Sequence, residues 1–260
     1  MWRRDASQWA NSAPILFPIV GALKNDTCVI NGKEYHMTQH GFARHNEFET
    51  NQVSDTEVIF SLKSNDEIIK QYPFLFELNV TYRLVENKLK CHIEVKNTDH
   101  QPIYFQVGGH PAFACPFMEN ESSNDYYLEF SENETCNRKI IDVEKRGMSR
   151  VEKPFFDNEK RFFVRQELFN TDAIVIKNFK SENIALKSLN HDKSIVFHMN
   201  GFDHVGLWAA KHVGGLIAIE PWVGHADYTD FNGEFKEKES CVELPVGKNF
   251  EVEFAVEINQ

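Results

Sequence analysis

Strict alternation of apolar and polar residues is the feature that most constrains the fold of this chain. Apolar side chains occupy every second position over residues 74–84, and the same period resumes over residues 89–95 after the polar break at residues 86–88. Successive side chains of a β-strand point to opposite faces, so each run predicts a strand with one buried face. Two such runs joined by a short polar break predict an antiparallel hairpin.

The same patterning extends through the rest of the chain. Residues 250–258 alternate in the same way, with glutamates on the polar face, and Asn-Gly pairs at residues 31–32, 200–201 and 232–233 mark turns. The 22 phenylalanines also favour pleated, half-buried strand surfaces. Shorter strands are predicted at residues 57–63, 126–130, 173–177, 184–189, 194–199, 205–210 and 216–220. We therefore predict one all-β domain over residues 1–260, built as a large antiparallel β-sandwich.

Helices and long loops have little place in this prediction. Residues 5–10 and 113–118 are short helical candidates, and the polar residues 119–124 and the charged residues 142–153 are interpreted as loops. No linker, internal repeat or alternation of strands with helices divides the chain.

Composition excludes several classes of function. The formal net charge is −11 and no lysine or arginine cluster is present, so we expect no nucleic-acid partner. The five cysteines are scattered and form no Cys-x-x-Cys pair, which favours reduced thiols over disulfides or a thiolate zinc site. The first 12 residues lack an apolar signal-peptide core, and no run of 18 apolar residues occurs. We expect a cytoplasmic protein without a membrane span.

Four segments carry side chains that are unusual in a purely structural protein. They are residues 39–44, residues 108–113, the position just before the apolar run 173–176, and residues 219–222, where an apolar strand ends in a carboxylate followed by an aromatic residue. The candidate site residues in these segments are His40, Arg44, His110, Asp172, Glu220 and Trp222.

Each candidate taken alone has an ordinary structural explanation. His110 could make a local hydrogen bond beside its glycines, and Asp172 could cap a turn. Glu220 could pair with Lys211, and Trp222 could simply pack in the core.

Two physical arguments favour a functional pair. Glu220 follows an apolar strand, so its carboxylate needs a partner to compensate for lost hydration. The Gly-Gly step before His110 would let the backbone pack beside a ligand. Acid–base chemistry needs a donor and an acceptor aimed at one small molecule, and an imidazole with a carboxylate supplies both.

Four motifs together resemble the aldose 1-epimerase family. They are Ser-Ala-Pro-Ile-Leu-Phe-Pro-Ile-Val-Gly at residues 12–21, His-Gly-Phe-Ala-Arg at 40–44, Gly-His-Pro-Ala-Phe at 109–113 and Ile-Glu-Pro-Trp at 219–222. They occur in the family's order and most resemble its LacX-like, galactose-mutarotase-related branch. The resemblance implies an antiparallel β-sandwich that binds an aldose, with or without a phosphate group, in a cleft on one sheet. It implies no metal and no organic cofactor, because only protons move.

The resemblance also implies a role for each candidate residue. His110 matches the family's general acid, which protonates the ring oxygen, and Glu220 matches the general base, which takes the proton of the anomeric hydroxyl. Ring opening, rotation about C1–C2 and closure from the other face would then interconvert the anomers. The resemblance implies that His40 and Asp172 bind the sugar and that Arg44 contacts a hydroxyl or a phosphate. It also implies that Trp222 stacks on the sugar ring.

The sequence departs from the family pattern near its beginning. Relatives carry a strand pair before the segment that here starts at Trp2, so we expect those strands to be missing. Asn11 stands where relatives often have arginine, and Gly21-Ala22 replaces a Gly-Arg step of true galactose mutarotases. The sugar therefore stays open, as does the choice between monomer and homodimer.

Three alternatives remain. The first is a sugar-binding protein without catalytic activity on the same scaffold. The second is a glycoside hydrolase that uses Glu220 with Asp172 or Asp227 as its two carboxylates.

The third alternative is a metal site. His36, His40 and His45 show superficial ligand spacing, and His225 with Asp227 adds a further pair. No helical pattern places these histidines on one face, so we do not expect a metal there.

Overall fold

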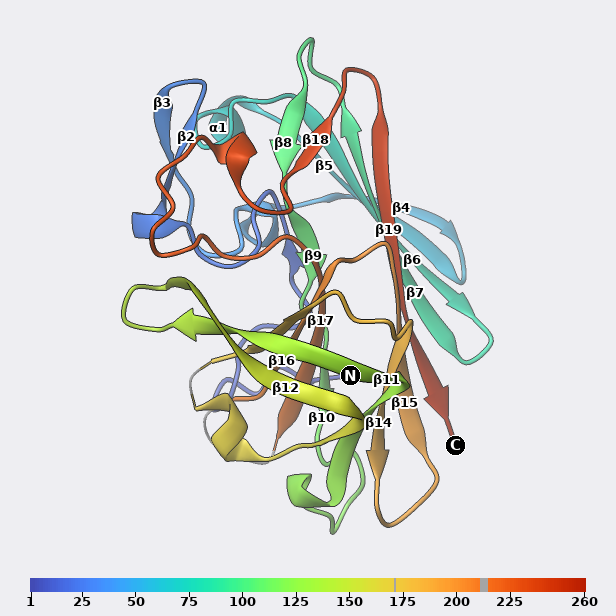
Figure 1. Cartoon of the computed structure of the whole chain (residues 1–260). Coiled ribbons are helices and arrows are strands. Elements are labelled where there is room, and N and C mark those ends of the chain that lie inside the picture. Colours follow the sequence, from blue (N-terminus) through green and yellow to red (C-terminus); the bar gives the residue numbers. More distant parts are fainter. Residues whose placement is uncertain (171, 211–214) are drawn as a thin grey trace.

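β-strands dominate the computed structural model, which describes residues 1–170, 172–210 and 215–260 (Figure 1). The strands of the first half are β1 (Ile15–Leu16), β2 (Thr27–Ile30), β3 (Lys33–His36), β4 (Glu49–Ser54), β5 (Glu57–Lys63), β6 (Phe76–Val85), β7 (Lys88–Asn97), β8 (Ile103–Phe105), β9 (Val107–Gly109) and β10 (Ala112–Ala114). Those of the second half are β11 (Tyr126–Asp142), β12 (Gly147–Phe163), β13 (Ile174–Lys177), β14 (Asn183–Ser188), β15 (Ser194–Asn200), β16 (His204–Trp208), β17 (Leu216–Val223), β18 (Val242–Leu244) and β19 (Asn249–Asn259). The helical elements are α1 (Asp66–Ile69) and the 3-10 turns η1 (Lys24–Asp26), η2 (Ala43–His45), η3 (Ser123–Asp125), η4 (Gln166–Phe169) and η5 (Phe235–Glu237).

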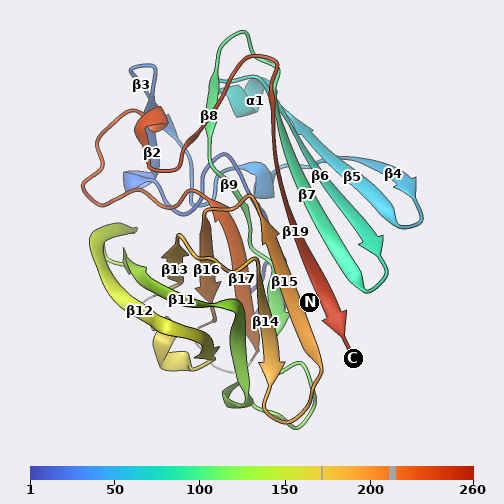
Figure 2. The same cartoon turned by 45° about the vertical axis from the view of Figure 1, so that its right-hand side comes forward.

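Fifteen of the described strands form one sheet. Its order is β1-β9-β17-β16-β13-β11-β14-β15-β19-β7-β6-β5-β4, with β10 on β17 and β12 on β11, while β18-β8 and β2-β3 form two small ribbons. Paired strands of the described chain run antiparallel throughout. Figures 1 and 2 show β4–β7 and β19 fanned together on one side and β11–β17 on the other. The fold is the predicted large antiparallel β-sandwich.

The predicted hairpin is confirmed. β6 and β7 pair with Leu78 opposite Val95 and Val80 opposite Ile93, and all four side chains are buried. The C-terminal alternating run becomes β19, which pairs with β7 on the other side. The alternation thus fixes which face of three neighbouring strands enters the core, because a shift of one residue would turn every side chain to the opposite face.

Three local predictions are wrong. Residues 142–153, predicted as a loop, contain only a tight turn at residues 143–146, because β11 and β12 form a long hairpin. Most of β12 is exposed, so its charged residues solvate an edge strand rather than a loop. The helix predicted at residues 113–118 begins instead as strand β10, and residues 5–10 form a turn. The short helix α1 was not predicted, although the side chain of Asn65 caps it by accepting hydrogen bonds from the amides of Glu67 and Ile68.

An aromatic cluster fills the core on the side of the β6–β7 hairpin. The Phe17 ring lies 4.9–6.1 Å, between ring centroids, from four other aromatic rings, and all five side chains are buried. The four neighbours are Phe42, Tyr72, Phe76 and Phe105. They join the N-terminal segment to strands β6 and β8, so this cluster holds the N-terminal quarter of the chain against the sheet. No helix among the described residues has the length and hydropathy needed to cross a membrane.

We predict that Phe76→Ala lowers the free energy of unfolding by about 3–5 kcal/mol, because it opens a cavity among packed rings. Leu84→Ala on the same strand is the matched control, since Leu84 is 54% exposed, and should change stability by no more than about 0.5 kcal/mol. Urea unfolding followed by circular dichroism measures both. Equal losses in the two variants would contradict this account of the core.

Candidate active site

The register of strands β9, β10 and β17 brings His110 and Glu220 together. Gly108 pairs with Trp222, and Ala112 pairs with Ala218. His110 lies midway between Gly108 and Ala112, and Glu220 lies midway between Ala218 and Trp222. The two residues therefore face each other across the paired segments. Residues directly opposite each other on an antiparallel pair present their side chains on the same face. This arrangement explains how residues far apart in the sequence meet.

Glu220 lies within β17 and not at its end, as the sequence had suggested. The strand continues to Val223, and every residue of it is buried. Ile217 and Ile219 face the core, whereas Ala218, Glu220 and Trp222 face the opposite side. The carboxyl group therefore stands on the inner wall of a site, 2% exposed.

Glycines on both neighbouring strands make room for the Trp222 indole. A Cβ atom added to Gly108 would lie 2.8 Å from Cδ1 of Trp222, and one added to Gly206 would lie 2.7 Å from its ring carbons. A Cβ atom on Gly109 would lie 2.9 Å from the Phe254 ring. The Gly-Gly step before His110 therefore serves packing within the protein, and the predicted close approach to a ligand is not its evident purpose.

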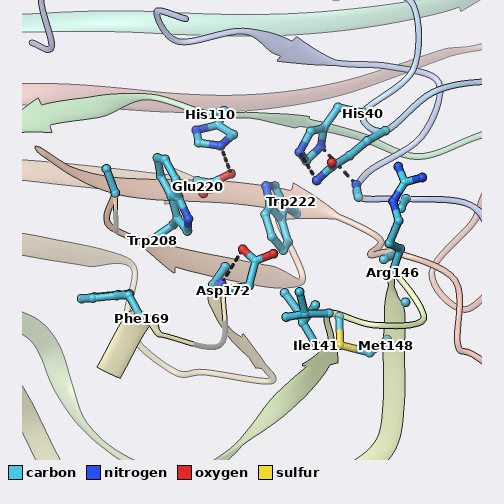
Figure 3. Close-up of a pocket in the computed structure, with 18 of the residues that line it drawn as sticks. His40, His110, Ile141, Arg146, Met148, Phe169, Asp172, Trp208, Glu220 and Trp222 are labelled. Atoms are coloured by element: carbon cyan, nitrogen blue, oxygen red, sulfur yellow. Dashed lines mark hydrogen bonds and ion pairs between the residues drawn. The ribbon is translucent and has the colours of Figure 1, made fainter. Parts of the chain in front are cut away.

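All six candidate residues line one cavity of about 630 Å³, a size typical of small-molecule sites. Figure 3 shows His110 and His40 along one wall, Asp172, Ile141 and Met148 along the other, and Glu220 and Trp222 between them. The residues brought together are His40, Arg44, His110, Asp172, Glu220 and Trp222. The pairing of Glu220 with Lys211 concerns a residue outside those that the structure describes.

Burial displaces the protonation equilibria of both central groups. Nε2 of His110 lies 3.2 Å from Oε2 of Glu220. Loss of hydration holds the pKa of Glu220 well above its usual range, and the negative charge of the Asp172 carboxylate raises it further. Loss of hydration also lowers the pKa of His110, to about 3. Both directions favour uncharged groups, so the pair carries one proton across the neutral range.

His40 is held in a defined orientation. Its Nδ1 accepts a hydrogen bond from the amide of Gly21 at 3.1 Å, which leaves Nε2 as the protonated, donating nitrogen of the neutral ring. Burial and the neighbouring His110 hold the pKa of His40 well below its usual range. His40 therefore offers the cavity an uncharged N–H donor.

Asp172 and Arg44 are less constrained. Oδ1 of Asp172 accepts a hydrogen bond from the amide of Ala173, and its carboxylate is close enough to Glu220 to raise the pKa of that group. Nε of Arg44 donates to Nε2 of His45 at 3.1 Å. The remaining guanidinium nitrogens of Arg44 stay available at the rim of the cavity.

The N-terminal wall of the site was not predicted from the sequence. The Trp9 ring stacks on His110 with ring centroids 4.6 Å apart, and its edge meets Trp208. The indole of Trp2 donates to the Trp9 carbonyl, and the Trp2 amide donates to Ala112 of β10. The only available signal was two tryptophans in an otherwise polar segment, which shows no strand or helix period.

Two of the alternative arrangements are not assembled, namely Glu220 with Asp227 and the histidine cluster, whereas Glu220 and Asp172 do line the same cavity. Asp227 contacts the Lys238 ammonium group and accepts a hydrogen bond from the Lys24 amide, and it does not line the cavity. It is therefore not placed to act as a second hydrolase carboxylate beside Glu220. Within the described residues, the histidines at positions 36, 40 and 45 form no cluster of metal ligands.

Comparison with known proteins gives this geometry a family. The family model described as aldose 1-epimerase matches residues 2–243. The chain belongs to the aldose 1-epimerase family. The plasmid-encoded protein LacX of Lactococcus lactis subsp. lactis is 35% identical over 238 residues, which are 86% of this chain and 77% of the relative.

Solved structures of the family superpose closely on the chain. A galactose mutarotase related enzyme from Lactobacillus acidophilus has a TM-score of 0.94 at 31% identity, covering 100% of this chain and 87% of the other. A galactose mutarotase-like protein from Lactobacillus casei has a TM-score of 0.91 at 30% identity, covering 99% and 88%. Membership of the aldose 1-epimerase family thus agrees with the sandwich fold and supports a sugar-related function.

The lowered pKa of His110 predicts a dependence of stability on pH. A pKa below that of the unfolded chain, about 6.5, means that stability is complete above pH 6.5 and is lost as the pH falls towards 3. Glu220 acts in the opposite direction. Its pKa is higher in the folded protein than in the unfolded chain, so lowering the pH between these two pKa values stabilises the folded state. Below about pH 6.5, His110→Asn should therefore lose stability less steeply than the wild type, by about 1.4 kcal/mol per pH unit.

Urea unfolding at several pH values between 4.5 and 9 measures the two slopes. Between pH 8 and 9 the difference between the two proteins should be constant, which provides the internal control. Parallel curves below pH 6.5 would show that His110 is not held uncharged by burial.

Proposed function

We propose that this protein interconverts the α and β anomers of an aldose by acid–base opening and closing of the sugar ring. His110 protonates the ring oxygen, and Glu220 accepts the proton of the anomeric hydroxyl. The bond from C1 to the ring oxygen breaks as the C1 carbonyl forms, and rotation about C1–C2 precedes closure from the other face. Protons taken and given balance over the cycle, so the chemistry needs no oxidant and no metal.

The contact between His110 and Glu220 is the single observation that carries this proposal. The two oxygens that must gain and lose protons are both bonded to C1, so an acid and a base that serve them must be close neighbours. The imidazole and carboxyl group lie 3.2 Å apart. One proton moved from Glu220 to His110 creates the acid and the base without changing the net charge of the buried pair.

Unpaired polar atoms in the cavity support a polar, uncharged ligand. Among the described residues, Nδ1 of His110 and Nε1 of Trp222 are buried without a hydrogen-bond partner, and Oε2 of Glu220 has only its 3.2 Å contact with His110. Such atoms cost free energy unless a ligand or water satisfies them. Sugar hydroxyls act as donors and acceptors at once, and the Trp222 indole offers an apolar face for the sugar ring to stack on.

His40, Asp172 and Arg44 complete the proposed sugar site from three directions. The Nε2–H group of His40 donates to one hydroxyl, and the Asp172 carboxylate accepts from another. The exposed side of Arg44 contacts a further hydroxyl or a phosphate group on the sugar. This division leaves His110 and Glu220 free for proton transfer.

We predict that Glu220→Gln nearly abolishes mutarotation and leaves sugar binding largely intact, because the amide keeps the shape of the side chain and cannot accept the proton. His110→Asn should lower the rate about a hundredfold or more. The decay of optical rotation of freshly dissolved α-aldoses measures turnover, and calorimetric titration measures binding. A panel of aldoses and hexose 6-phosphates identifies the substrate.

Glu34→Gln is the matched control, because Glu34 lies exposed on β3 far from the cavity lining. It should retain the wild-type rate. Wild-type turnover in Glu220→Gln or His110→Asn would refute the assignment. Tight sugar binding by the wild type without any acceleration of mutarotation would show instead a carbohydrate-binding protein on this scaffold.

A further inference from the structure

We propose a binding site for a divalent transition metal, of the zinc type, at His204, His225 and Glu239. These residues come from the start of β16, the segment after β17 and the turn after η5. One ligand atom from each lies within 4.8 Å of the other two. Two imidazoles and one carboxylate form a ligand set that binds zinc and leaves a fourth position open.

Both imidazoles present an unpaired nitrogen to the centre of this cluster. Nδ1 of His204 lies 2.8 Å from Oδ1 of Asp203, and Nδ1 of His225 lies 2.6 Å from the carbonyl oxygen of Ala226. An oxygen acceptor at Nδ1 fixes the hydrogen there, so Nε2 carries the lone pair that a metal needs. Within the described part of the chain, neither Nε2 has a hydrogen-bond partner, and the His204 and His225 side chains are 0% and 2% exposed.

Glu239 faces these lone pairs with another acceptor. Its Oε2 lies 3.5 Å from Nε2 of His225, which is longer than a normal hydrogen bond. A cation between the imidazole nitrogens and this oxygen converts mutual repulsion into coordination. Donor atoms around a tetrahedral zinc ion lie roughly 3.4 Å apart, so metal binding would draw together the three ligand atoms, which lie within 4.8 Å of one another.

The groups around Glu239 are compatible with a bound cation. Lys177 donates to the other oxygen, Oε1, at 2.5 Å, and the Tyr228 hydroxyl donates to Oε2 at 2.6 Å. Lys139 bonds that hydroxyl at 2.8 Å and lies 3.5 Å from Glu152. Lys139 also lies 3.8 Å from Oε1 of Glu239. The three carboxylates of Glu239, Glu152 and Asp203 outnumber the two ammonium groups, so we infer that negative charge remains to offset the charge of the metal.

The position of the cluster indicates a structural role for the metal. His204 pairs with Trp222 of β17, and His225 precedes Ala226, which lines the sugar cavity. A metal would tie the segment after β17 to β16 and to the turn after η5. It would hold one wall of the cavity without touching the His110–Glu220 pair.

Zinc analysis of untagged protein after dialysis tests the site. We expect about one zinc ion per chain, as for a site with three protein ligands, and a visible absorption band when Co²⁺ replaces zinc. His225→Gln should lose both. Asp203→Asn weakens the support of His204 and the contact of Asp203 with the Gly224 amide, and it should lower zinc affinity about 10–100-fold. His92→Gln is the control, because His92 pairs with Glu251 on the outer surface, and it should bind zinc like the wild type.

Circular dichroism checks that each variant is folded. If His225→Gln does not fold, Glu239→Gln supplies the same comparison, because this side chain is partly exposed and its replacement keeps the shape. Zinc that dialysis removes from the wild type, or equal zinc content in all variants, would overturn the proposal. The mutarotation assay is not involved, so failure here leaves the proposed function untouched.

Discussion

The whole site depends on one carboxyl group in the middle of a fully buried strand. Every residue of β17 is buried, and Glu220 is only 2% exposed. Such burial is unfavourable for a charged group unless a partner compensates. The register of β9 and β10 against β17 supplies His110 as that partner. A shift of this register by one residue would place the two side chains on opposite faces, so strand pairing and proposed chemistry share the same constraint.

The sequence predicted those parts of the fold in which burial decides the pattern. β6, β7 and β19 each have one face in the core, so their alternation marks them directly. The hairpin of β11 and β12 leaves most of β12 and a part of β11 exposed, and the charged residues there resemble a loop in the sequence. Backbone pairing, which leaves little trace in side-chain polarity, defines that element. The same lack of periodicity hid the N-terminal wall that carries Trp9.

The site was predictable where motifs carried it and not where only packing did. The residues around His110 and Glu220 suggested an acid–base pair, and the resemblance to the family implied sugar contacts for His40, Arg44 and Asp172. The contribution of Gly108 and Gly109 was misread, because their close neighbours are the Trp222 indole and the Phe254 ring. Which atoms crowd a glycine depends on strands that are adjacent only in the folded chain. Sequence spacing therefore could not distinguish a glycine that faces a ligand from one that faces a side chain.

Trp222 also explains how two polar clusters coexist on one face of the sheet. It lies between Glu220 of its own strand and His204, its partner on β16. With Val175, Met148 and Tyr228 it forms a small buried apolar group. Beyond that group stand Lys139 and Lys177, whose positive charges would lower the pKa of Glu220 if they approached it. Burial and the Asp172 carboxylate instead raise the Glu220 pKa, and the nearby Trp222 N–H group opposes them only in part. The indole thus separates a region of fixed charges from the His110–Glu220 pair, so in the proposed mechanism a substitution of Trp222 would affect proton transfer as well as sugar stacking.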